Sequence, residues 1–263
     1  MNTISILGTG WLGLPLAQDF IKAGYEVKAS TTSENRIADL TSIGAKPFIV
    51  NIDTLTDSVK DFLQSDILIV NITSKNIEGF SDLVTRIEAS DIQKIIFVSS
   101  TSVYENSKRI MTESDTEYYK ESPLLAIESL FQHCRGTETT IVRFGGLIGY
   151  RRHPGNFFKS KRVVQNPDAP VNLIHRDDCV GILREIVEQQ IWDEIFNCCA
   201  DTHPGKREFY TRAANLIDNT PPEFGESNAS VGKIISNHKV KQLLNYEFKH
   251  PDLMKLAFNG STV

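Results

Sequence analysis

The chain has 263 residues, of which 40% are hydrophobic and 23% charged, and its formal net charge is −5 at pH 7. This composition is typical of a soluble globular protein, and the negative balance disfavours nucleic acid as the main partner. No apolar run approaches the roughly 20 residues needed to cross a bilayer. The N-terminus also lacks the charged segment of a signal peptide, so we expect a cytoplasmic protein with no membrane partner.

The first 24 residues organise the chain. Residues 3–7 form an apolar run that predicts a buried strand, and a G-x-G-x-x-G turn follows at Gly8, Gly10 and Gly13. Apolar side chains then recur at helical spacing over residues 12–23. Gly8 would allow the tight turn, Gly10 would let a pyrophosphate approach the backbone, and Gly13 would let the helix pack on the strand. We therefore predict a dinucleotide site that includes the intervening Trp11 and Leu12; the alternative is a turn that only connects strand to helix.

The second predicted strand, residues 25–30, bears on the choice of cofactor. NAD-preferring sites usually place an acid at this strand end, and none of residues 28–33 is acidic. Hydrogen-bond donors are present instead, at Ser30, Thr31, Thr32 and Arg36, and Lys28 adds a second positive charge. These groups suit a 2′-phosphate, so NADP is slightly favoured over NAD. A simpler role for the segment is a helix start, with Ser33 capping residues 34–43.

Strand and helix alternate through the first 100 residues. Apolar segments predict strands at 46–50, 66–71 and 95–98, and amphipathic segments predict helices at 55–63 and 80–90. This alternation implies right-handed crossovers and a doubly wound parallel sheet, a Rossmann fold, with ligands at the carboxyl ends of the strands. Asn71 and Ser99 stand at two of these ends and are predicted to face the cofactor.

The second half is less regular. A polar loop is expected over 104–120, a glycine- and arginine-rich loop over 145–155, strands at 140–143, 171–175 and 195–199, and helices at 124–134, from 178 onward and at 209–217. The tail from Lys233 is expected to form a short extended piece and two short helices. We predict a Rossmann domain over 1–143, completed by strands near 171–175 and 194–199, and an interleaved, smaller C-terminal substrate lobe over 144–263.

The four cysteines, Cys134, Cys179, Cys198 and Cys199, have neither zinc-finger nor C-x-x-C spacing, so we expect reduced core residues. No set of histidine, cysteine and acidic residues has metal-ligand spacing, so no metal is predicted. His175 ends a predicted buried strand and is expected to satisfy the backbone there.

Taken in order, these motifs resemble the extended short-chain dehydrogenase/reductase superfamily, in particular the nucleoside-diphosphate-sugar epimerase-like group. The resembling segments are the glycine turn, Asp53 after the third strand, the serine-rich strand end at 99–104, and the segments 143–149 and 172–178. The resemblance implies that Asp53 contacts adenine and that Ser100 occupies the catalytic Ser/Thr position.

One departure from the superfamily concerns catalysis. Its members use a Tyr-x-x-x-Lys pair on the helix after the serine-rich strand, the tyrosine acting as general acid or base. Aligning on Glu128 puts Lys120 and Leu124 at these positions, and aligning on Ser122-Pro123 puts Leu124 and Glu128 there. We therefore expect a chain without the pair, as in the atypical branch of the superfamily.

Other candidate residues each have a simpler role beside the catalytic one. Ser100 could polarise a carbonyl or cap the strand end; Tyr118 and Tyr119 could supply the acid or base or cover the core. Tyr104 does not align with the tyrosine of the family's catalytic pair and is a weaker candidate for the acid or base. The predicted anion site for a substrate comprises Arg143, Arg151, Arg152 and His153, with surface solvation as the alternative.

Two functions follow. The first is an NAD(P)-binding oxidoreductase or nucleotide-sugar epimerase-like enzyme acting on a small anionic substrate. The second is a catalytically impaired, cofactor-binding pseudoenzyme or NAD(P)(H) sensor that acts through a protein partner.

Overall fold

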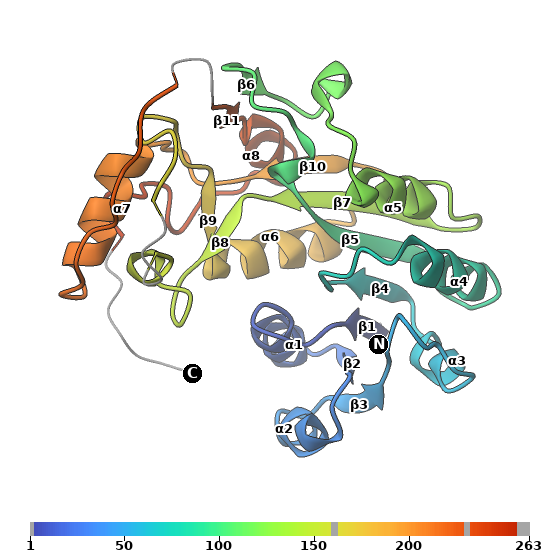
Figure 1. Cartoon of the computed structure of the whole chain (residues 1–263). Helices are drawn as coiled ribbons and strands as arrows, with labels where there is room; N and C mark the ends of the chain where they lie inside the picture. Colours follow the sequence, from blue (N-terminus) through green and yellow to red (C-terminus); the bar gives the residue numbers. More distant parts are fainter. Residues whose placement is uncertain (1–2, 159–162, 229–231, 257–263) are drawn as a thin grey trace. The chain divides into compact units, whose positions relative to one another are not determined.

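A seven-stranded sheet forms the centre of the fold in the computed structural model, which describes residues 3–158, 163–228 and 232–256 (Figure 1). The strands, in spatial order, are β3 (Lys46–Ile49), β2 (Glu26–Thr31), β1 (Thr3–Leu7), β4 (Ile67–Val70), β5 (Lys94–Ser100), β7 (Glu138–Phe144) and β10 (Ile195–Cys198). The pairs from β3 to β5 are parallel. The order reverses between β1 and β4, and ligands of such sheets bind at this switch point. The predicted α/β fold is confirmed.

Helices cover the sheet as the alternation predicts. They are α1 (Gly13–Lys22), α2 (Ile37–Ser42), α3 (Val59–Phe62), α4 (Ile77–Glu88), α5 (Pro123–Gln132) and α6 (Arg176–Glu188). All four residues of β4 are buried, as expected for a central parallel strand. Against it and β5 pack apolar side chains of α3, α4 and α5. The rings of Phe97 and Phe131 stack at 4.9 Å, with Phe80 edge-on at 5.8 Å from Phe131.

The chain divides into two compact units. The first comprises Met1–Ser99, Glu121–Val142 and Ile182–Ile195, and the second Ser100–Lys120, Arg143–Gly181 and Phe196–Val263. The predicted boundary at 143/144 is therefore incomplete. The chain enters the second unit at Ser100, in the serine-rich strand end. It re-enters the first unit at Ile182, within α6.

The second unit contains two small sheets. Strand β8 (Gly146–Ile148) pairs in parallel with β9 (Leu173–His175), and β6 (Ile110–Met111) pairs with β11 (Ile234–Ile235). The prediction that residues 171–175 complete the central sheet is wrong, because β9 pairs with β8. The prediction for 194–199 is correct, because β10 is the strand next to β7. Residues 146–148, predicted as loop, form β8 because Ile148 is fully buried beside Leu173.

The remaining helices are α7 (Lys206–Asn215) and α8 (His238–Leu244). The tail forms β11 and α8, but no second helix follows through residue 256, where the described chain ends. All four cysteines are buried and unpaired, as predicted. In the described ranges, no helix combines the length and apolar character needed to cross a membrane.

Candidate functional site

The glycine turn is held in place by two polar side chains from neighbouring strands. The amide of Gly8 donates to Ser30 Oγ at 2.8 Å, and Asn71 Nδ2 donates to the Gly8 carbonyl at 3.1 Å. Gly8 has φ +98°, and a Cβ on it would lie 2.5 Å from the Asn71 carbonyl oxygen. A Cβ on Gly13 would lie 2.1 Å from the Gly8 carbonyl oxygen, so both positions require glycine for the chain's own packing.

Gly10 is different. Apart from Gly10 and its two chain neighbours, no atom of the described chain lies within 4 Å of the position a Gly10 Cβ would take. In the first turn of α1, the Leu14 amide donates to the Gly10 carbonyl at 3.0 Å and Pro15 has no N–H. Leu12, the N-cap residue, makes no side-chain capping bond. The first turn of α1 also carries no acidic side chain. This corner can therefore receive an anionic group from outside the chain.

A cavity of about 300 Å³ adjoins the turn. Its walls are made by Gly8, Thr9, Gly10, Ser30, Thr31, Thr32, Ser33, Arg36, Val50 and Ile72. Six of these residues belong to the predicted cofactor site. The sequence argument missed Thr9, Ser33, Val50 and Ile72; Val50 and Ile72 follow the ends of β3 and β4, where the parallel sheet directs ligands. Larger hollows lie elsewhere, including one of about 840 Å³ beside α7, but none of them contains the glycine turn.

The end of β2 supplies donors, not acids, to this cavity. Ser30 is buried and holds the turn, and Arg36 Nη2 donates to the Thr9 carbonyl at 3.2 Å. Arg36 Nε lies 3.4 Å from Asp39, which is mostly exposed, so this ion pair neutralises the guanidinium only weakly. Ser33 occupies the N-cap position of the short helix Glu34–Arg36, but its side chain makes no capping bond.

Arg36→Ala is expected to weaken NADPH binding by about 10- to 100-fold, the effect of losing one charge-assisted hydrogen bond to a phosphate. NADH affinity should change by less than about twofold, because NADH lacks the 2′-phosphate. Titration of each nucleotide, followed by fluorescence, measures both affinities. Lys28→Gln is the matched control, because the Lys28 amine donates to the carbonyls of Asp61 and Gln64 and is not part of the cavity wall. Equal losses for both nucleotides would contradict a 2′-phosphate role for Arg36.

Six predicted cofactor residues lie outside the cavity wall: Trp11, Leu12, Gly13, Asn71, Asp53 and Ser99, of which the last two have other side-chain partners. Asp53 accepts a 2.7 Å hydrogen bond from Asn76 Nδ2, and Asn76 caps α4 by accepting from the Gly79 amide. Ser99 is buried, and its hydroxyl donates to Glu128 in α5. Both side chains therefore have structural partners, and their contact with adenine or nicotinamide stays a prediction.

Ser100 begins the second unit. Its Oγ accepts a 3.1 Å hydrogen bond from the Ser102 amide and so caps the short helix η2 (Thr101–Val103). This is the capping role considered from the sequence. A role in polarising a carbonyl stays a prediction.

A buried arginine joins two tyrosines in the second unit. Arg143, at the end of β7, is 1% exposed, and its Nη1 donates to the hydroxyls of Tyr104 and Tyr119, both at 2.7 Å. The guanidinium also lies over both rings, 5.3 and 4.8 Å from their centroids. Tyr104 is buried and donates to Asn197 Oδ1, and burial raises the pKa of its hydroxyl to about 12, although the Arg143 charge opposes that shift. Tyr119 is partly exposed, and its hydroxyl accepts from a cationic donor.

The Tyr-x-x-x-Lys spacing does occur once in the sequence, at Tyr104 and Lys108, which corrects the expectation that the chain lacks it altogether. These two residues do not form the family's pair. Lys108 is exposed with φ +56°, and the residues between them are not helical, so the two side chains do not share a helix face. Helix α5 contains neither tyrosine nor lysine, and Tyr118 precedes it, with its ring under Arg109.

The predicted anion site is dispersed. Arg143 is enclosed by the two tyrosines. Arg151 and Arg152 are exposed in a turn closed by mutual backbone hydrogen bonds between Gly149 and Arg152. His153 is buried and caps the next short turn through Gly155, and burial lowers its pKa. Arg151 and Arg152 are therefore the exposed members of the predicted site, whereas the other two side chains are buried.

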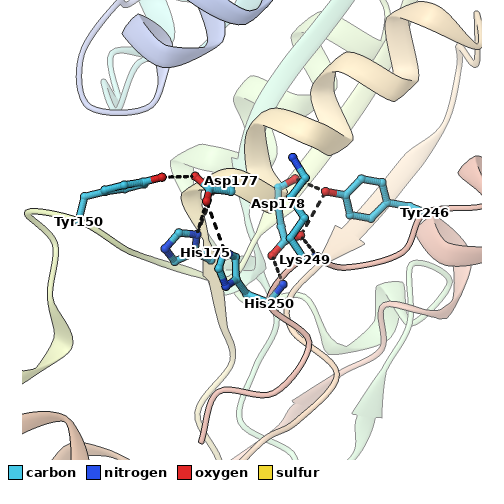
Figure 2. Close-up of polar contacts among 7 residues, drawn as sticks. All are labelled: Tyr150, His175, Asp177, Asp178, Tyr246, Lys249 and His250. Atoms are coloured by element: carbon cyan, nitrogen blue, oxygen red, sulfur yellow. Dashed lines mark hydrogen bonds and ion pairs between the residues drawn. The ribbon is translucent and has the colours of Figure 1, made fainter. Parts of the chain in front are cut away.

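A further cluster surrounds the start of α6 (Figure 2). Asp177 Oδ2 lies 3.5 Å from His175 Nδ1 and 3.3 Å from His250 Nε2, and Tyr150 donates to Asp177 Oδ1 at 2.8 Å. Burial alone would raise the pKa of Asp177, but the hydrogen bonds from His250 and Tyr150 lower it to about 2. Burial lowers the pKa of His175 to about 4. His175 Nδ1 also accepts from the Asp177 amide at 3.3 Å, the backbone role predicted for it.

Comparison with known proteins bears directly on the glycine turn. A family model described as NAD(P)H-binding matches residues 8–187, from the turn into α6. The chain belongs to this family. This confirms NAD or NADP as the cofactor and leaves the choice between them a prediction.

Similar proteins extend the comparison over almost the whole chain. Protein YeeZ of Escherichia coli K12 is 29% identical over 270 aligned positions, covering 96% of this chain and 97% of that protein. UDP-glucuronic acid 4-epimerase from Bacillus cereus, solved with UDP-glucuronic acid and NAD, superposes with a TM-score of 0.78 at 17% identity, covering 96% and 95% of the chains. A functionally unknown conserved protein from Silicibacter pomeroyi superposes equally well, at 16% identity, covering 97% and 96%. These likenesses confirm the predicted fold, which this chain shares with the epimerase.

Proposed function

We propose that this chain is an NAD(P)-dependent oxidoreductase or epimerase-like enzyme whose substrate is small and anionic, a nucleotide sugar being the leading candidate. The observation that carries the proposal is the open corner at Gly10, where a Cβ would meet only the neighbouring residues and where Leu12 makes no side-chain cap on α1. The structural likeness to an epimerase solved with a UDP-sugar supports the substrate class. Arg151 and Arg152 are exposed guanidinium groups that suit the phosphates of such a substrate.

The acid/base residue in this proposal is Tyr119. Bound NAD(P) in its oxidised form would accept a hydride from the substrate carbon. Tyr119 would take the proton of the substrate hydroxyl as the carbonyl forms, and would return it in the reverse reaction. Arg143 would stabilise the phenolate through the 2.7 Å hydrogen bond, the electrostatic task that the lysine has in the family. Tyr104 is less suited to this task, because its buried hydroxyl has a pKa of about 12.

The second candidate function is a cofactor-binding sensor without turnover. One observation favours it: helix α5 carries neither the tyrosine nor the lysine of the family's pair. A sensor needs the cavity beside the glycine turn but makes no use of a tyrosine proton. The two functions therefore differ in turnover and agree in cofactor binding.

Cofactor titration followed by a turnover screen separates these functions. Saturation with either nucleotide at about 100 times its Kd should stabilise the fold by about 2.7 kcal/mol, seen as a rise in thermal midpoint. The protein with the better-bound nucleotide is then screened against UDP-sugars and simple carbonyl compounds for a change in nicotinamide absorbance or for epimerised product. Binding without turnover would favour the sensor, and the absence of any binding would exclude both functions.

Ser100→Ala is expected to lower kcat by about 10²-fold or more, the cost of removing a hydrogen-bond donor from a developing oxyanion, with cofactor affinity unchanged. The reason is the position of Ser100 at the carboxyl end of β5, where the family places its catalytic hydroxyl. Steady-state kinetics on a substrate from the screen measures the effect. Ser102→Ala is the control, since Ser102 contributes its amide, not its hydroxyl, to the same cap. Equal turnover in wild type and Ser100→Ala would restrict Ser100 to capping.

A further inference from the structure

The cluster at the start of α6 brings together residues that are distant in sequence. His175 ends β9, Asp177 lies in the first turn of α6, and His250 lies in the segment after α8. One ligand atom from each of the three residues lies within 4.8 Å of the other two. Figure 2 shows both imidazole rings directed toward the same Asp177 carboxylate. Two imidazoles and a carboxylate form a ligand set that holds first-row divalent metals in proteins.

The distances also fit a metal. Two ligand atoms bound tetrahedrally to zinc, each about 2.0–2.1 Å from the ion, lie about 3.3–3.4 Å apart. Asp177 Oδ2 is 3.5 Å from His175 Nδ1 and 3.3 Å from His250 Nε2. Asp177 Oδ2 therefore already lies at about the tetrahedral separation from both nitrogens, and the two nitrogens, which lie within 4.8 Å of each other, would move together around one ion. The long bond from the Asp177 amide to His175 Nδ1, at 3.3 Å, is the contact that the ion would replace.

The cluster is fixed by a second layer of contacts. Asp178 is fully buried, and its carboxylate accepts from the amides of Lys249 and His250, at 2.6 and 3.1 Å. This fastens the segment carrying His250 to the helix that carries Asp177. Tyr150 donates to the second oxygen of Asp177, and a Cβ on Gly149 would lie 2.5 Å from His175 Nε2, so glycine there leaves room for the ring. Such outer contacts orient the ligands of protein metal sites.

The charges around the cluster select the kind of ion. Asp177 is the one carboxylate among the three ligands, and the preceding residue, Arg176, adds a positive charge at the start of the same helix, with its guanidinium over the Tyr150 ring. Magnesium and calcium depend on several oxygen ligands and would be poorly held. Zinc and its first-row neighbours form strong bonds to imidazole nitrogen, which offsets the repulsion.

We propose that His175, Asp177 and His250 form a binding site for a divalent transition-metal ion such as Zn²⁺. With three protein ligands, the ion keeps a position open to water or a substrate oxygen. It would also cross-link β9, α6 and the segment after α8. The proposal goes beyond the cofactor-dependent function and does not rest on it, since the ligands belong to the second unit and the glycine turn to the first.

Metal titration of tag-free protein, stripped with a chelator and desalted, tests this proposal. Co²⁺ absorption and Zn²⁺ competition against a coloured chelator should show one ion bound per chain. His250→Gln and Asp177→Asn should each weaken Co²⁺ binding by at least about tenfold, since even outer-shell changes cost about 10- to 100-fold. His238→Gln, which alters an exposed histidine of α8, should bind as wild type does.

Circular dichroism identifies any ligand variant that fails to fold. If a ligand variant fails to fold, the Tyr150→Phe variant tests the metal site instead, because it keeps all three ligands. It should weaken Co²⁺ binding by about tenfold through loss of one hydrogen bond to Asp177. A wild-type protein that binds neither ion saturably overturns the proposal, as does a folded His250→Gln protein with unchanged affinity. The cluster is then a hydrogen-bonded triad. NADH and NADPH titrations on the same samples report separately on the cofactor site.

Discussion

Gly10→Val is expected to abolish NADH and NADPH binding at ordinary concentrations while leaving the protein folded. The valine side chain would project into a space where, apart from Gly10 and its two chain neighbours, no atom of the described chain lies within 4 Å of the Cβ. It would hold a pyrophosphate away from the backbone amides of the glycine turn. Hydrogen bonds to charged groups contribute about 1.5–3 kcal/mol each. Loss of two therefore weakens binding by at least about 100-fold.

Fluorescence titration and thermal denaturation with each nucleotide measure this effect. Gly8→Ala is the informative comparison, because its φ of +98° and its contact with the Asn71 carbonyl predict strain in the folded protein itself. We expect Gly8→Ala to lose about 1–3 kcal/mol of stability before any cofactor is added. Gly10→Val should keep the wild-type thermal midpoint. A Gly10→Val protein that binds either nucleotide as tightly as wild type would remove the glycine turn from the proposed site.

The central sheet was predictable because its signals are local. Strands β1, β4 and β5 are mainly apolar and β2 alternates polar and apolar residues; helices follow these strands, and a parallel sheet follows from that alternation. The glycine turn was predictable for the same reason: strand, turn and helix lie within 24 consecutive residues. The cavity beside it contains Ser30, Thr31, Thr32 and Arg36, which were identified from the end of one strand.

The second unit was less predictable because its pairings join distant segments. Residues 171–175 were recognised as a strand, but β9 pairs with β8, a three-residue strand within a glycine-rich stretch. Arg143 was predicted to bind an anion on account of its charge. Its enclosure by Tyr104 and Tyr119 depends on residues 24 and 39 positions away. Arginine is rarely buried unless it has partners, and the two hydroxyl groups that are among the partners of Arg143 leave no pattern in the sequence.

The His175, Asp177 and His250 cluster shows the same limit. A spacing rule recognises metal ligands only when they lie within a short motif or a known pair of motifs. His250 is 73 residues from Asp177, and the contact that brings it close is the buried carboxylate of Asp178. The adjacent acids Asp177 and Asp178 are typical of a helix start. They do not predict that the segment with His250 packs against this helix.

Tyr119→Phe is expected to lower kcat by about 10²–10⁴-fold, the usual contribution of a positioned acid or base. The change removes one oxygen, and with it the hydroxyl that accepts from Arg143 at 2.7 Å. The ring remains, so the contact between the aromatic face and the guanidinium persists. Kinetics on a substrate from the turnover screen, with cofactor affinity measured in parallel, separates catalysis from binding. Cofactor Kd should change by less than about twofold, because Tyr119 lies outside the glycine-turn cavity.

Two neighbouring tyrosines make the comparison decisive. Tyr118→Phe removes the same oxygen one residue earlier, from a ring that lies under Arg109, and should leave kcat within about twofold of wild type. Tyr104→Phe removes the other Arg143 partner from a buried site and should lower stability by about 1 kcal/mol through the lost bond to Asn197. If the folded Tyr119→Phe and Tyr118→Phe proteins were equally active, the hydrogen bond from Arg143 would serve to hold Tyr119 in place and not to assist proton transfer. The proton would then have to come from another group, because the α5 helix offers neither tyrosine nor lysine.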